Sequence, residues 1–75
     1  MSEDADRRTG RVASFDDARG LGVVAGDDGS ELGFHCTAIA DGTRTIEEGV
    51  PVSYRTRARH LGRWEATDIR PVVPA

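Results

Sequence analysis

The chain has 75 residues, which allows one small domain with a single hydrophobic core. Apolar residues make up 37% of it and charged residues 31%, a balance typical of a folded chain rather than a disordered one. Cys36 is the only cysteine, so a disulfide within the chain is excluded. The first residues do not resemble a signal peptide and no apolar run could span a bilayer, so we expect a soluble cytoplasmic protein without a membrane partner.

The formal net charge of −3 hides an uneven distribution, and all ten basic residues are Arg. Residues 1–48 carry eleven acids and five Arg, a net charge of −6, whereas residues 49–75 carry two acids and five Arg, a net charge of +3. A basic C-terminal third fits either a strip that faces phosphate groups or a solvated strand face. Charge alone favours the solvated face.

Residues 1–9 show no apolar periodicity and are expected to form a disordered tail. One domain is expected over residues 10–71, followed by a short tail over residues 72–75. Within the domain, runs rich in β-branched and aromatic residues predict short strands at 10–15, 21–25, 31–36, 50–59 and 63–70.

The connections between these runs carry turn signals. The Gly-Asp-Asp-Gly-Ser segment at 26–30 predicts a hairpin, and residues 45–48 fit a one-turn helical capping box that Gly49 would end. Five short strands at this spacing predict an all-β fold, a closed five-stranded antiparallel barrel. The apolar side chains expected in its core are Val12, Val24, Leu32, Phe34, Ile39, Val52 and Ile69.

Seven short motifs follow one another along the chain. The first three are Gly-Arg-Val-Ala-Ser-Phe at 10–15, Arg-Gly-Leu-Gly-Val-Val at 19–24 and Asp-Asp-Gly-Ser at 27–30. The other four are Phe-His-Cys-Thr-Ala-Ile at 34–39, Arg-Thr-Ile-Glu-Glu-Gly at 44–49, Val-Ser-Tyr at 52–54 and Ala-Thr-Asp-Ile at 66–69. In this order they resemble the G-x-V-K-W-F-N, K-G-F-G-F-I, D-D-G-S, V-H-F-S-A-I, K-T-L-E-E-G, V-S-F and A-A-N-V motifs of the cold shock domain family. The resemblance implies a barrel of the OB-fold type.

In that family, aromatic rings on the second and third strands stack unpaired bases of RNA or DNA, and basic side chains follow the backbone. This chain lacks six of the family's aromatic residues, and the positions now hold Ser14, Leu21, Val23, Gly33, Cys36 and Thr43. Phe15 and His35 keep positions that the resemblance assigns to the binding surface, whereas Phe34 replaces a core valine. The resemblance therefore implies a protein that binds single-stranded RNA or DNA weakly and with low sequence specificity.

The candidate binding residues combine the remains of this surface with the arginines. The expected platform comprises Phe15, Arg19, Leu21, Val23 and His35. Electrostatic contributions are expected from Arg11, Arg44, Arg55, Arg57 and Arg59, of which the last three share one strand face because side chains alternate with a period of two. Trp64 either packs within the protein or is an exposed ring that stacks a base.

No catalytic residue, cofactor or metal site is predicted. The sequence has no nucleophile elbow, and His35, Cys36 and His60 are too few to form an ordinary zinc site. One alternative stays open, a barrel that has lost nucleic-acid binding and acts as a protein-interaction module through exposed Leu21 and Val23. In both cases we expect a monomer or a weak homodimer.

Overall fold

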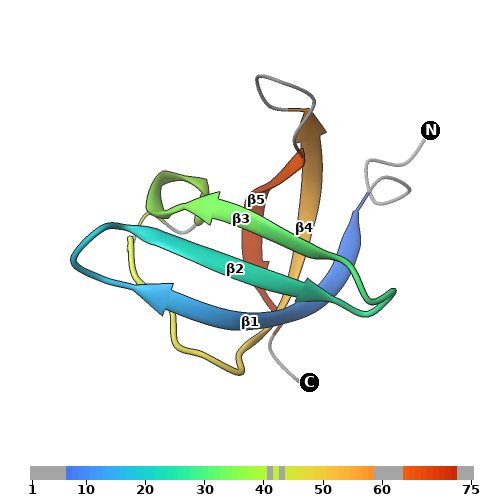
Figure 1. The fold of residues 1–75 in the computed structure, drawn as a ribbon, viewed down its shortest axis with the longest axis horizontal. Coiled ribbons are helices and arrows are strands. Elements are labelled where there is room, and N and C mark those ends of the chain that lie inside the picture. Colours follow the sequence, from blue (N-terminus) through green and yellow to red (C-terminus); the bar gives the residue numbers. More distant parts are fainter. Residues whose placement is uncertain (1–6, 41, 43, 59–63, 73–75) are drawn as a thin grey trace.

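The computed structural model describes residues 7–40, 42, 44–58 and 64–72. The described residues form the strands β1 (Arg8–Asp16), β2 (Leu21–Gly26), β3 (Glu31–His35), β4 (Pro51–Ala58) and β5 (Trp64–Pro71), with a short 3-10 helix, η2 (Cys36–Ala38), after β3. The strands close a barrel in the order β1-β2-β3-β5-β4 (Figure 1). The predicted all-β barrel is confirmed. Among the described residues, no helix has the length and apolar character needed to cross a membrane.

One pairing departs from the predicted antiparallel arrangement. β3 and β5 run parallel where Gly33 pairs with Glu65, and the other neighbouring strands are antiparallel. Strand direction cannot alternate around a closed ring of five, so one neighbouring pair must be parallel. Figure 1 shows β1, β2 and β3 as a meander that β4 and β5 cross at a steep angle.

Inward-pointing residues of the strands, together with one residue after η2, form the core. Its buried side chains are Val12, Val24, Phe34, Ile39, Val52, Tyr54, Ala66 and Ile69. The predicted core residue Leu32 is instead half-buried and packs against this cluster from the side. It lies at the start of β3, where pairing with β5 begins only at the next residue. Tyr54 joins the core because it follows buried Val52 at the strand period of two, and burial raises the pKa of Tyr54.

The ring of Phe34 occupies the space in front of Gly22. A Cβ atom at Gly22 would lie 2.5 Å from Cζ of Phe34 and 2.8 Å from the carbonyl oxygen of Ser14, so this position requires glycine. The Phe15 ring stacks on Phe34 with 5.8 Å between centroids and 7° between planes. Phe15 therefore points inward and is half-buried, rather than forming part of an outer platform. The cause is a bulge at Ala13, after which Phe15 pairs with Gly22.

The predicted helical turn at the end of the β3–β4 connection is absent. Residues 45–47 are not helical, and Glu48 and Gly49 form a turn with Gly49 at a φ of +84°. The backbone there bonds to β1 instead, since the Gly49 N–H donates to the carbonyl of Val12 at 2.8 Å and the Val12 N–H donates to the carbonyl of Val50 at 3.0 Å. The segment that the capping-box motif predicted to be helical is instead held by hydrogen bonds to β1. A prediction from neighbouring residues alone cannot include such contacts with a distant strand.

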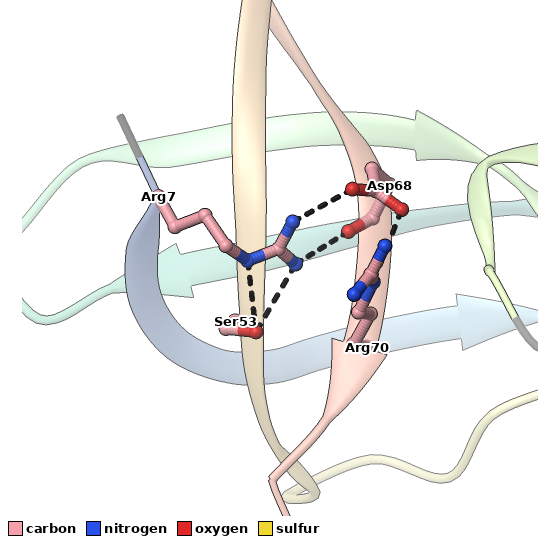
Figure 2. Close-up of polar contacts among 4 residues, drawn as sticks. All are labelled: Arg7, Ser53, Asp68 and Arg70. Carbon is pink, nitrogen blue, oxygen red and sulfur yellow. Dashed lines mark hydrogen bonds and ion pairs between the residues drawn. The ribbon is translucent and has the colours of Figure 1, made fainter. Parts of the chain in front are cut away.

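The folded region begins earlier than predicted. β1 starts at Arg8, and Figure 2 shows the side chain of Arg7 held against β4 and β5. Nη1 of Arg7 lies 2.7 Å from Oδ2 of Asp68, and Nη2 donates to the Asp68 carbonyl oxygen at 2.7 Å. Nε and Nη2 also donate to the Ser53 hydroxyl at 3.3 and 3.1 Å. Only 12% of the Arg7 side chain is exposed, so it belongs to the fold and not to a tail.

Asp68 lies at an irregularity in β5. The β4–β5 register shifts between Ser53 and Arg55, and Asp68 has a φ of +48°, in the left-handed region. Arg7 supplies a donor to the Asp68 carbonyl at this break in the ladder. The Arg7 hydrogen bond also holds the pKa of Asp68 below its ordinary value, and Arg70, 3.3 Å from Oδ1, acts in the same direction.

Replacing Arg7 by Ala is expected to lower the free energy of unfolding by about 1–3 kcal/mol, because its charge-assisted hydrogen bonds to Asp68 are lost. The adjacent Arg8 provides the control. Its side chain is 55% exposed and pairs with the exposed Asp28 at 3.0 Å, so Arg8→Ala should lower the free energy of unfolding much less than Arg7→Ala. Urea denaturation of both variants at pH 7 measures the difference, and equal losses would contradict the assignment.

The same pair of variants has an expected pH dependence. The pKa of Asp68 is lowered in the folded state, so its stabilising contribution is present above the ordinary value of 3.8 and is lost as pH falls through the folded value. The stability gap between wild type and Arg7→Ala should therefore narrow below about pH 4.

Candidate nucleic-acid interface

The outer side of β2 and β3 gathers three of the predicted binding residues, Leu21, Val23 and His35. Their strand neighbours point toward the core, so alternation turns these three outward. In the ladder Leu21 pairs with His35, and Val23 pairs with Gly33. Leu21 is 46% exposed. The structure thus brings an apolar pair and an imidazole onto one surface, which we call the β2–β3 face.

The β2–β3 face has small residues where rings would stand. Val23 lies between Ser14 of β1 and Gly33 of β3. A Cβ atom at Gly33 would meet only the Gly22 carbonyl oxygen, at 3.8 Å, which is ordinary van der Waals contact. The surface therefore has room for a flat ligand, and the apolar contact available to a base comes from Leu21 and Val23.

His35 is held in place by the helix that follows it. Nδ1 of His35 accepts a hydrogen bond from the backbone N–H of Thr37 at 3.2 Å and lies 2.9 Å from the Thr37 hydroxyl. A ring nitrogen that accepts a hydrogen bond carries no proton, so the neutral imidazole has its N–H on Nε2. Thr37 therefore orients the ring. The sequence did not predict this role, because nothing in it shows that His35 caps the short helix and so contacts Thr37, two residues later.

Arg57 approaches this region because the barrel is closed. Arg57 of β4 pairs with Glu65 of β5, which pairs in turn with Gly33 of β3. Nε of Arg57 lies 3.1 Å from Oε1 of Glu65, and 65% of the Arg57 side chain is exposed against 16% of Glu65. Both line a hollow of about 240 Å³ that His35 also lines. Glu65 was missed in the sequence, since its position depends on β5 lying next to β3.

The predicted arginine strip on β4 is present for two of its members. Arg55 pairs with Thr67 and is half-buried, and Arg57 follows two residues later on the same side of the strand. Arg59 lies outside the described residues. The strip therefore borders the β2–β3 face across β5, with the Glu65 carboxylate between them.

The remaining candidate arginines are dispersed around the barrel. Arg11 on β1 is exposed and donates to the Gly49 carbonyl at 3.2 Å. Arg19, in the turn before β2, lies 3.8 Å from a carboxylate oxygen of Asp16, and both side chains are exposed. Arg44 is exposed in the β3–β4 connection at a φ of +60°. Of the three, Arg19 is nearest in the chain to Leu21.

Trp64 does not join the β2–β3 face. It opens β5, pairs with Ala58 of β4 and is 60% exposed. Since the next residue, Glu65, points to the hollow beside His35, alternation directs Trp64 to the other side of the strand. There it lines a separate groove together with Leu32.

In the part of the chain that the structure describes, no three His, Cys, Asp or Glu side chains come together as metal ligands. Cys36 is half-buried, with Sγ 3.8 Å from Nδ1 of His35. His60, the third ligand considered, lies outside the described residues.

The closed five-stranded barrel and its outer β2–β3 face are the features by which the class of this protein is recognised. The sequence pattern of the 'Cold-shock' DNA-binding domain matches residues 8–72, and the chain belongs to the cold-shock domain family. Among its relatives is the cold shock-like protein CspA of Stigmatella aurantiaca, 46% identical over 66 residues, a match that covers 85% of this chain and 96% of that protein. Cold shock protein 2 of Lactiplantibacillus plantarum is 34% identical over 65 residues, with 85% and 97% covered.

A solved structure of Drosophila Unr, CSD456, has the same fold. The TM-score is 0.77 at 24% sequence identity, and the match covers 99% of this chain. This chain spans only 32% of that structure, so the comparison concerns the barrel alone.

Proposed function

We propose that this protein is a non-enzymatic, cytoplasmic binder of single-stranded RNA or DNA that uses the β2–β3 face with low sequence specificity. The observation that carries the proposal is the placement of Leu21, Val23 and His35 on one outer face of a cold-shock domain barrel. Leu21 and Val23 offer apolar contact to unpaired bases, and His35 offers a ring and an N–H. Such contacts do not distinguish strongly between bases.

Weak binding follows from the missing rings. Each base stacked on an aromatic side chain is worth about 1–3 kcal/mol, so three missing stacks would cost about 3–9 kcal/mol if they were additive. This corresponds to a loss of ~10² to 10⁶ in affinity. The Glu65 carboxylate pairs with Arg57 and offsets its charge, so Arg57 attracts phosphate less strongly on the β5 side of the face.

A second candidate function is favoured by the exposure of Leu21 at 46% next to Val23. An exposed apolar pair on a strand is also suited to contact with another protein or a second copy of the chain. In that case the barrel would be an interaction module without affinity for nucleic acid.

A titration with single-stranded oligonucleotides at two salt concentrations separates the two functions. If arginines contact about three phosphates, the slope of log affinity against log salt should be near −2, from about −0.7 per contact. Fluorescence anisotropy of a labelled oligonucleotide measures the affinity at each of the two salt concentrations. Absence of binding at low salt would contradict the proposal and leave the interaction module.

A further inference from the structure

A second surface lies on the other side of β5 from the β2–β3 face. A groove of about 290 Å³ is lined there by Arg8, Ser30, Leu32, Thr56 and Trp64. Leu32 and Trp64 come directly before Gly33 and Glu65, the residues at which β3 and β5 pair. The groove thus lies where these two strands begin to diverge.

The groove is built around an exposed indole. Trp64 is 60% exposed, an unusual position for the largest apolar side chain of the protein. Leu32, half-buried against the core, contributes aliphatic surface next to it. An aromatic wall with an apolar neighbour suits a flat ring, and the volume is at the small end for ligand sites.

The charge of the groove selects the kind of ring. Among the described residues that line the groove, Arg8 is the only charged one, and none of them is acidic. Arg8 pairs outside the groove with Asp28 at 3.0 Å, and both side chains are about half exposed, at 55% and 52%. Such a solvated pair costs little to exchange for another anion. A stacking ring beside an available guanidinium fits a base with its phosphate.

We propose that this groove binds one unpaired base of a single-stranded nucleic acid, stacked on Trp64, with Arg8 contacting a phosphate of the same strand. The proposal rests on the function proposed above and adds a contact point separate from the β2–β3 face. Trp64 would then be a base-stacking ring on β5, at a position where none of the six missing family rings would stand.

Trp64 is the only tryptophan of the chain, so its fluorescence reports on this groove directly. An unlabelled oligothymidylate of about twelve nucleotides, a length within the range that OB-folds occupy, serves as the probe. We expect quenching of Trp64 emission that saturates at the same concentration as binding measured by anisotropy of the labelled oligonucleotide. Trp64→Ala should weaken binding roughly 5- to 150-fold, and Trp64→Phe should retain most of the affinity.

Two further variants complete the test. Arg8→Gln should make the log–log salt slope less steep by about 0.7. Val72→Ala, which removes another exposed apolar side chain, 44% exposed just after β5, should leave affinity unchanged. Circular dichroism of each variant checks that the barrel is intact.

The outcomes distinguish this inference from the proposed function. Binding by anisotropy with unchanged Trp64 emission, and with unchanged affinity of Trp64→Ala, would overturn the groove site and leave the function in place. Absence of binding by anisotropy would contradict both. A blue shift of the emission that grows with protein concentration, without oligonucleotide, would show a second copy covering Trp64 and would also overturn the site.

Discussion

The double variant Leu21→Phe/Val23→Phe is expected to bind single-stranded nucleic acid more tightly than the natural chain by about 2–6 kcal/mol, or roughly 30- to 10⁴-fold. Both side chains project from the outer side of β2, next to His35 and Gly33. Gly33 has no side chain and its outer side is open, so a ring at position 23 meets no steric obstacle there. Each new ring therefore adds a stacking surface on a backbone already oriented for it.

Anisotropy titrations of the wild type and the double variant measure this gain. The matched control is Val72→Phe, which adds a ring at an exposed apolar position just after β5 and should leave affinity unchanged. An equal gain from Val72→Phe would indicate nonspecific ring contact. No gain from the double variant would show that the β2–β3 face is not a base platform, and the interaction module would then be the better description.

The second large effect concerns stability, where Phe34→Ala is expected to lower the free energy of unfolding by about 3–5 kcal/mol. The ring is 3% exposed and fits against Gly22, so its removal leaves a cavity that the surrounding strands cannot close. For a domain of 75 residues, the usual value of about 0.05–0.15 kcal/mol per residue gives a total stability of about 4–11 kcal/mol, so the loss is a large fraction of it. Urea denaturation followed by circular dichroism gives the value.

Phe15→Ala is the comparison, because its ring is half-buried on the same stack. It should cost less than Phe34→Ala, and a double-mutant cycle should give a coupling of about 0.5–1.5 kcal/mol between the two rings. If the two single variants lost equal stability and showed no coupling, the inward orientation of Phe15 would be wrong.

The strand order along the chain and most of the core could be predicted because both depend on local signals. Period-two alternation identifies Val12, Val24 and Phe34 as inward residues, and the Gly-Asp-Asp-Gly-Ser turn separates β2 from β3. The same alternation places Leu21 and Val23 on the outer side of β2, so the sequence alone predicts the central part of the candidate site.

Contacts between distant segments could not be predicted in this way. Arg7 has no apolar periodicity around it, yet it bonds to Asp68, 61 positions away, at an irregularity of β5 that no local pattern announces. The resemblance assigns Phe15 to the outer binding surface, but the bulge at Ala13 turns its side chain toward the core. A single inserted residue reverses the alternation, and the sequence alone does not show where a bulge falls.

The amino-acid sequence by itself therefore determined an all-β chain of cold-shock type, and it also showed that most of the rings of that family's binding surface are absent. Turn residues and the alternation of apolar and polar side chains are short-range properties, so they can be recognised in the sequence before the fold is known. The tertiary structure alone decided that β5 lies between β3 and β4, which sets Glu65 beside Arg57 and turns Trp64 to a groove of its own. These placements depend on how a ring of five strands closes, and closure is a property of the whole chain rather than of any segment.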